Sequence, residues 1–173
     1  MIFSIDSLCR IDVLKEHDEI RQPLLDLISN TPCDVLTEQT TELVTDFHTS
    51  NSGTERRQWV DYLLQYLDPH LQETVKLFGY QSYILQNIWF QQYTQGQNHG
   101  WHTHGGNYTN VYYLEFDEGA PKTQMREMGK TIEKDFDVKE SCVLSFPSYI
   151  WHTAPEVQNG KRKTIISWNM NFI

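Results

Sequence analysis

The stretch Tyr93–His104, YTQGQNHGWHTH, is followed much later in the chain by Phe146–His152, FPSYIWH. The first stretch reads as a strand, in which side chains alternate between two faces, so His102 and His104 are predicted to point the same way. His152 can then supply a third imidazole from another strand. Imidazole binds iron, zinc, copper and nickel alike. The pattern predicts a metal site on His102, His104 and His152, with open positions for water and substrate.

His99 lies in the same stretch but at an odd spacing from His102. An odd spacing puts two residues of a regular strand on opposite faces. We therefore expect His99 to lie in a loop near the mouth of the site and not to bind the metal.

The composition bounds the class of protein. The chain has 173 residues, 39% of them hydrophobic, and a net charge of −9. This predicts one globular domain, residues 1–173, and argues against an extended nucleic-acid-binding face, which requires clustered Lys and Arg. The cysteines Cys9, Cys33 and Cys142 form no C-x-x-C motif, so we expect no disulfide framework. Without a signal-peptide pattern or an apolar run near the ~20 residues of a membrane span, the sequence predicts a cytoplasmic protein with no membrane segment.

Two segments in the first part of the chain carry apolar residues at three- and four-residue spacing. Leu14–Ser29 and Thr54–Phe78 are predicted to form amphipathic helices. Between them, Thr31–Gly53 is polar and predicts an irregular, exposed connection. Residues 1–80 are therefore expected to be mainly helical, with an edge strand available from Met1–Ile11.

Four later segments are rich in β-branched and aromatic residues and predict strands. They are Tyr83–Tyr93, Thr109–Phe116, Cys142–Phe146 and Lys163–Phe172. Helices first and strands afterwards predict an α+β domain, with helices on one face of an antiparallel sandwich or barrel. The histidines fall near strand ends, where the mouth of a barrel holds a ligand.

Four motifs occur in a recognisable order: Tyr93-x-x-Gly96-Gln97-x4-His102-x-His104, then Val111–Leu114, Leu144–His152 and Gly160–Asn169. Together they resemble the Fe(II)- and 2-oxoglutarate-dependent dioxygenases of the prolyl-hydroxylase-like branch. The resemblance covers roughly residue 83 to the C-terminus. It implies a double-stranded β-helix (jelly-roll) core, residues 81–173, braced by the N-terminal helices of residues 1–80.

The same resemblance implies a chemistry. His102, His104 and His152 would hold Fe(II), and 2-oxoglutarate and dioxygen would be consumed in hydroxylating a prime substrate, either a peptidyl side chain or a small molecule. His104 stands where the family has Asp or Glu. A neutral imidazole in place of a carboxylate raises the net charge of the site by one, which alters the affinity for an anionic co-substrate.

In the family, a basic residue on the closing strand pairs with the distal carboxylate of 2-oxoglutarate. Arg162 and Lys163 are the candidates, and consecutive strand residues face opposite sides, so only one points inward. Aligning Ser167 and Asn169 with inward polar residues of the family selects Lys163. Aligning Trp168 with an inward aromatic residue selects Arg162. Other candidates for contacts with the co-substrate are Asn169, Tyr93 and Tyr113.

Two alternative functions stay open. Gly96-(x5)-His102-x-His104 and Pro147-(x4)-His152 also fit the two halves of the cupin motif, although the glutamate of that motif is absent. A three-histidine cupin would be a metal dioxygenase or an isomerase, and it would need no buried cation in the final strand. The other alternative is a non-catalytic metal-binding module.

The segment Asp117–Glu140 separates the two histidine-bearing motifs and contains the breakers Gly119, Pro121 and Gly129. A connection this long in a compact domain is usually functional. We expect it to form a rim or lid over the prime substrate. Met125 and Met128 either supply an adaptable apolar contact there or pack beneath the loop.

Overall fold

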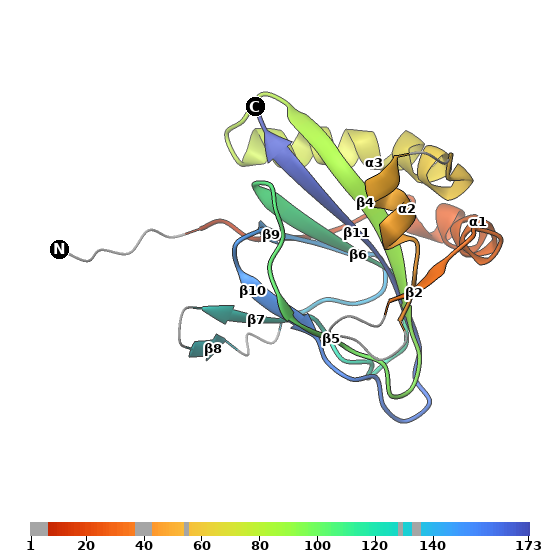
Figure 1. Cartoon of the computed structure of the whole chain (residues 1–173). Helices are drawn as coiled ribbons and strands as arrows, with labels where there is room; N and C mark the ends of the chain where they lie inside the picture. Colours follow the sequence, from red (N-terminus) through yellow and green to blue (C-terminus); the bar gives the residue numbers. More distant parts are fainter. Residues whose placement is uncertain (1–6, 37–42, 54–55, 128–129, 133–135) are drawn as a thin grey trace.

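The computed structural model describes residues 7–36, 43–53, 56–127, 130–132 and 136–173 (Figure 1). Its helices are α1 (His17–Ser29), α2 (Phe47–Ser52) and α3 (Gln58–Leu77). The strands of the N-terminal part are β1 (Arg10–Val13), β2 (Asp34–Leu36) and β3 (Leu43–Thr45). Those of the C-terminal part are β4 (Tyr83–Tyr93), β5 (His99–His102), β6 (Tyr108–Phe116), β7 (Gln124–Glu127), β8 (Lys130–Ile132), β9 (Cys142–Pro147), β10 (Trp151–Ala154) and β11 (Lys163–Phe172).

The strands form two antiparallel sheets. The large sheet has seven strands in the order β1-β9-β6-β11-β4-β3-β2, and the small sheet has four in the order β5-β10-β7-β8. Helices α1 and α3 cover one face of the large sheet, and the small sheet lies on its other side (Figure 1). The protein is thus a mixed helix and sheet structure built on antiparallel sheets.

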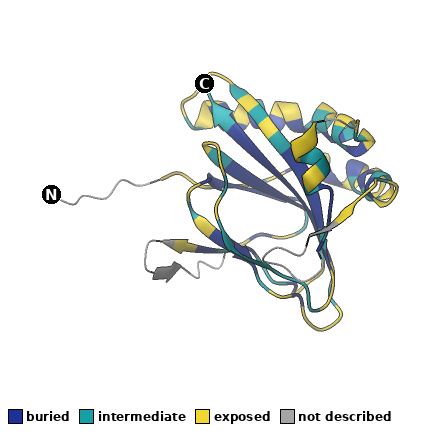
Figure 2. Ribbon diagram, viewed as in Figure 1, coloured by how far each residue is buried: buried dark blue, intermediate teal, exposed yellow. Residues whose placement is uncertain are grey.

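The large sheet separates two layers of core. Side chains of β11 alternate between them: Ile166 and Trp168 pack with the helices, whereas Ile165 packs toward the small sheet. The central strands are consequently buried on both faces (Figure 2). Each large apolar side chain fully buried in this way contributes about 1.5–3 kcal/mol relative to an exposed one. The second layer is where the polar residues of the site lie.

Several sequence predictions are confirmed. Helices α1 and α3 form within the two predicted helical segments, and β4, β6, β9 and β11 coincide with the four predicted strands to within one residue at each end. Of the edge strand predicted from Met1–Ile11, residues 1–6 lie outside the described residues. The strand β1 pairs with β9 at the edge of the sheet and shares only Arg10 and Ile11 with that prediction. Among the described residues, no helix is long and apolar enough to cross a membrane.

The prediction of an irregular, exposed connection over Thr31–Gly53 is wrong. This segment contains β2, β3 and α2, and Thr45 and Asp46 are fully buried. The Asp46 carboxylate accepts hydrogen bonds from the backbone N–H of Phe90 at 3.0 Å, from Trp59 Nε1 at 2.9 Å and from Arg57 at 2.9 Å. Partners distant in the sequence satisfy these polar groups, so a polar composition did not mean exposure.

The segment Asp117–Glu140, for which a rim or lid is predicted, is partly extended in the structure and contributes Thr123 to the lining of the pocket. Its described part forms β7 and β8, and β7 pairs with β10, with Met125 opposite His152. Met125 is buried in the core between the sheets, whereas Met128 lies outside the described residues. This part of the segment therefore belongs to the small sheet, in which β7 and β8 follow β10.

Candidate metal centre

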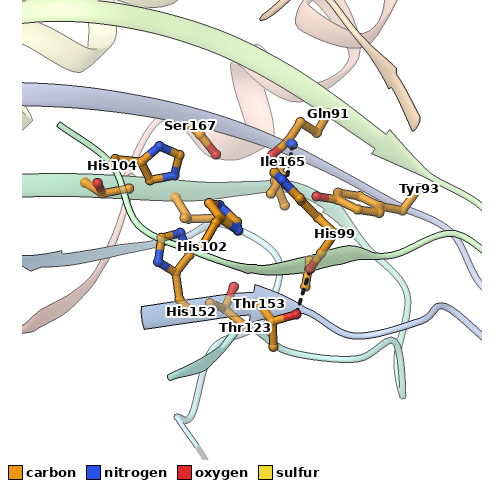
Figure 3. A pocket seen from close by; sticks show the side chains of 13 residues that line it. Gln91, Tyr93, His99, His102, His104, Thr123, His152, Thr153, Ile165 and Ser167 are labelled. Carbon is orange, nitrogen blue, oxygen red and sulfur yellow. Dashed lines mark hydrogen bonds between the residues drawn. The ribbon is translucent and has the colours of Figure 1, made fainter. Parts of the chain in front are cut away.

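Three histidines converge between the two sheets. His102 ends β5, His152 lies on β10 directly opposite it in the register, and His104 follows β5 by two residues. One ring nitrogen from each lies within 4.8 Å of the other two. Figure 3 shows the three rings grouped at one end of a pocket. The residues that the sequence singled out as metal ligands are therefore brought together.

The position of His104 has a different origin from the one expected. Strand alternation cannot aim its side chain, because β5 ends at His102. Instead, the His104 backbone N–H donates to the carbonyl of Ser148 at 3.0 Å, in the turn between β9 and β10. The His104 ring packs against Trp89, with ring centres 5.4 Å apart. A contact from another part of the chain thus completes the group.

Backbone carbonyls orient two of the three rings. His102 Nδ1 lies 2.7 Å from the carbonyl oxygen of Gly100, and His152 Nδ1 lies 2.9 Å from that of Ile150. A carbonyl only accepts, so each Nδ1 carries the proton and donates it. This leaves the lone pair on Nε2, as in protein metal sites whose histidines are held by a second hydrogen bond.

The same histidines are held neutral. Burial, and then the neighbouring imidazoles, lower the pKa of His104 to about 2. Burial lowers the pKa of His152 to about 3, with His102 adding to the effect, and burial also lowers the pKa of His102. Neutral imidazole is the form that binds a metal. Three such donors, with no carboxylate joining their group among the described residues, fit a borderline divalent ion such as iron, zinc, copper or nickel.

His99 lies inside the pocket, so the expectation that it faces away from His102 is wrong. In the register, His152 pairs with His102 and Ala154 with His99, so β5 has one more residue than β10 over this span. Such a β-bulge reverses the alternation. The His99 ring stacks on that of His102 with centres 3.9 Å apart and planes 15° apart, and its Nδ1 lies 3.2 Å from Gln91 Nε2.

A buried lysine lies toward the other side of the pocket. Lys163 is 1% exposed, its Nζ donates to the carbonyl of Pro121 at 3.0 Å, and it lies 4.7 Å from the centre of the Tyr93 ring. Burial lowers the pKa of Lys163 to about 7. Tyr93 lines the pocket beyond His99 as seen from the three histidines (Figure 3). A potential cation and a potential metal site thus adjoin the same pocket.

Tyr113 lies behind Thr123, which lines the pocket. Both residues are buried, and the Tyr113 hydroxyl lies 2.7 Å from Thr123 Oγ1. Burial raises the pKa of Tyr113 to about 12 and also raises that of Tyr93. Both phenols therefore stay protonated at neutral pH and can donate hydrogen bonds.

The remaining two predicted residues lie elsewhere. Arg162 has a half-exposed side chain whose Nε lies 2.8 Å from Glu115, outside the pocket. Asn169 is buried on the pocket side of β11, where its Oδ1 accepts from Thr109 Oγ1 at 2.9 Å. It lies six residues along the strand from Lys163, which corresponds to about 20 Å. Asn169 and Lys163 are therefore too far apart to bind the same carboxylate of a ligand.

Sequence reasoning missed several residues that line the pocket. On the strands they follow from period-two alternation, starting from Tyr93 on β4, Tyr113 on β6 and Lys163 on β11. These are Gln91, Thr109, Val111, Ile165 and Ser167. Thr123 had no comparable signal, because the strands around it were not predicted.

Comparisons with known proteins place the fold. No protein-family model matches the sequence, and no curated protein matches it. Among solved structures, an oxidoreductase of the 2OG-Fe(II) oxygenase family from Burkholderia pseudomallei is similar, with a TM-score of 0.65 and 11% identity, over 94% of this chain and 84% of the other. The viral collagen prolyl hydroxylase of Paramecium bursaria Chlorella virus-1, in a 2OG complex, has a TM-score of 0.65 and 14% identity, over 94% of each chain.

A third similar structure is a prolyl hydroxylase from Trichoplax adhaerens in complex with a peptide fragment of the hypoxia inducible factor oxygen degradation domain. Its TM-score is 0.60 and its identity 16%, over 92% of this chain and 82% of the other. At such low identities, the similarity shows a shared fold alone.

Proposed function

We propose that this protein is an Fe(II)- and 2-oxoglutarate-dependent oxygenase, a hydroxylase of a peptidyl side chain or a small molecule. The observation that carries the proposal is one pocket with three converging neutral imidazoles and, adjoining it, a buried lysine. Burying an ammonium group is unfavourable unless a partner compensates it. An anionic co-substrate that chelates a metal with one end and pairs with the lysine at the other accounts for both features.

His102, His104 and His152 would hold the metal, His102 and His152 through Nε2. Bound there, Fe(II) would supply dioxygen chemistry, because a metal held by three protein ligands would keep open coordination positions. The protein contributes rings fixed in direction and a pocket whose walls include Val111, Ile165 and Ala154, which limit the access of water.

Lys163 would bind the distal carboxylate of 2-oxoglutarate. An ammonium group has three protons to donate. In the part of the chain that the structure describes, the carbonyl of Pro121 is its only hydrogen-bond acceptor. Donors therefore remain for a ligand carboxylate, and the Tyr93 and Tyr113 phenols supply further ones. Arg162 is not assigned this role, because it pairs with Glu115 at the surface.

The architecture supports the same assignment. Two facing antiparallel sheets, with His102 and His152 paired on the small one, support a double-stranded β-helix for residues 81–173. The helices of residues 1–80 would brace it. The two prolyl hydroxylases with a similar fold, one of them described with a bound peptide fragment, favour a peptidyl prime substrate. Cys33 and Cys142 are free thiols, which agrees with a reducing cytoplasm.

A second function is favoured by a specific observation. The converging group consists of imidazoles alone, without the carboxylate usual in 2-oxoglutarate oxygenases. A three-histidine dioxygenase or isomerase of the cupin type, or a non-catalytic metal-binding module, would use such a group. Neither accounts for the buried Lys163, and we therefore rank both below the 2-oxoglutarate oxygenase.

The experiment that tests the proposal separates the two ligands. The protein is loaded with Fe(II) without oxygen, and the shift of its thermal midpoint by 2-oxoglutarate is measured, because a ligand of the folded state stabilises it. Air is then admitted and succinate is assayed. Lys163→Met should abolish the shift while retaining iron, whereas His152→Ala should lose both. If 2-oxoglutarate leaves the midpoint of the iron-loaded wild type unchanged, the proposal fails.

A further inference from the structure

His104 is held differently from the other two histidines of the metal centre. The rings of His102 and His152 each donate to a backbone carbonyl, but within the described ranges the ring of His104 makes no hydrogen bond. His104 also lies beyond the end of β5, so it has no place in the hydrogen-bond ladder of a strand. The direction of its ring therefore depends on where its backbone is held and on packing against Trp89, His102 and His152.

The backbone at His104 is held by the turn between β9 and β10. The His104 N–H donates to the Ser148 carbonyl at 3.0 Å, and the Ser148 N–H donates to the Asn107 carbonyl at 3.0 Å. Two backbone hydrogen bonds in opposite directions thus join the segment that follows β5 to the turn that precedes His152. A displacement of Ser148 displaces His104 directly.

Side chains from the large sheet anchor Ser148. Its Oγ lies 2.9 Å from Thr109 Oγ1, and Thr109 Oγ1 donates to Asn169 Oδ1 at 2.9 Å. A threonine hydroxyl has one proton, so the Ser148 hydroxyl is the donor to Thr109. Thr109 is 1% exposed, Ser148 0% and Asn169 5%. Water cannot replace these hydrogen bonds easily, and a buried group left without a partner is destabilising.

We infer that Thr109 is a positioning residue of the metal centre, which acts through Ser148 to hold His104 in ligating position, with Asn169 as the terminal acceptor. This rests on the metal site of the proposed function but not on its reaction or co-substrate. Asn169 lies too far from Lys163 to share a co-substrate carboxylate with it, but in this arrangement it has a role as the acceptor for Thr109. The arrangement also accounts for how His104, which lies outside a strand, is positioned without a hydrogen bond to its ring among the described residues.

Co(II) binding, followed by its visible absorption, tests this inference without turnover. Thr109→Val keeps the shape and removes the hydroxyl, whereas Thr109→Ser keeps the hydroxyl. The valine variant should bind Co(II) about 10- to 100-fold more weakly and with an altered spectrum, as expected for loss of an outer partner of a ligand. The serine variant should restore both. Ser148→Ala, which keeps the backbone carbonyl, should weaken binding in the same direction and provides a second test if Thr109→Val does not fold.

Thr164→Val is the matched control. Thr164 is also fully buried, and its hydroxyl donates to Glu115 at 2.8 Å, away from the three histidines. It should lower the stability of the metal-free protein without changing the Co(II) affinity or spectrum. Equal Co(II) affinities of Thr109→Val and wild type would overturn the role of Thr109 but not the metal site. So would equal losses in Thr109→Val and Thr164→Val, because the effect would then be general. Absence of Co(II) binding to the wild type would overturn the metal site itself.

Discussion

The ammonium group of Lys163 faces the ring of Tyr93 at 4.7 Å from the ring centre, inside a core that is otherwise largely apolar. Lys163 lies opposite Tyr93 in the pairing of β11 with β4. The contact compensates only part of the lost hydration, so the pKa of Lys163 falls to about 7. The charge on this residue is therefore sensitive to pH in the range where most proteins are studied.

The binding of 2-oxoglutarate should weaken as the pH rises above 7. A carboxylate partner raises the pKa of Lys163 in the complex, so binding above pH 7 takes up a proton. The affinity should fall by at most about tenfold per pH unit between the free and bound pKa values. Calorimetry with the metal-loaded protein, in buffers of different ionisation enthalpy, measures this proton uptake. An affinity that stays constant from pH 6 to pH 9 would contradict the assignment.

Lys163→Met should stabilise the protein at neutral pH. The pKa of Lys163 is lowered from 10.5 to about 7, so between these values the unfolded chain binds more protons and the stability of the wild type rises with pH. Replacing a buried charge by an apolar group is often stabilising by about 1–4 kcal/mol. Urea unfolding should show a gain at pH 7 that shrinks toward pH 10.5, and no comparable gain for Lys15→Met at the surface. A loss of stability would contradict this account.

Removing any one imidazole of the metal centre should sharply lower metal binding. His102→Ala, His104→Ala and His152→Ala each leave two of the three converging donors. Dialysis against Fe(II) or Zn(II), followed by metal analysis, gives the stoichiometry. The exposed His48 provides the control, because His48→Ala should bind as the wild type does. Full metal content in all three variants would show that the metal lies elsewhere.

His99 should support His102 through stacking without binding the metal. His99→Phe keeps an aromatic ring that can stack on His102 but loses the contact with Gln91. Metal affinity should change little in His99→Phe and fall severalfold in His99→Ala, in keeping with the about 0.5–1.5 kcal/mol of an aromatic pair. Metal titration of both variants is the measurement. If both lost the metal completely, His99 would be a ligand.

Asp46→Ala should be among the most destabilising single substitutions. It removes the buried carboxylate that accepts from Arg57, Trp59 and Phe90, and it leaves the Arg57 charge, 13% exposed, without its partner. Removing one partner of a buried ion pair lowers the free energy of unfolding by about 3–5 kcal/mol. Chemical denaturation measures the loss. Asp61→Ala is the control, because it breaks the exposed pair with Arg56 and should cost at most about 1 kcal/mol.

The local pattern of the chain contained much of the fold. Apolar periods of 3.6 and two residues depend only on near neighbours, and they identified α1, α3 and the four strands at the centre of the large sheet. The same alternation showed that Arg162 and Lys163 face opposite ways. The H-x-H pair in one short motif and the single histidine in the other were enough to identify the candidate metal ligands, because few residue types bind metals and these histidines lie near strand ends.

Other features depended on contacts between distant parts of the chain. The β-bulge between β5 and β10 directs His99 into the pocket. The alternation of residues within β5 alone does not predict this bulge. Ser148 holds His104 beyond the end of its strand, and Asp46 is buried by partners from α3 and β4. Only tertiary packing shows which of the two basic residues is buried: Lys163 is enclosed, whereas Arg162 pairs with Glu115 at the surface. A sequence lists the hydrogen-bonding groups of a chain, but only tertiary packing decides which of them meet and which stay in water.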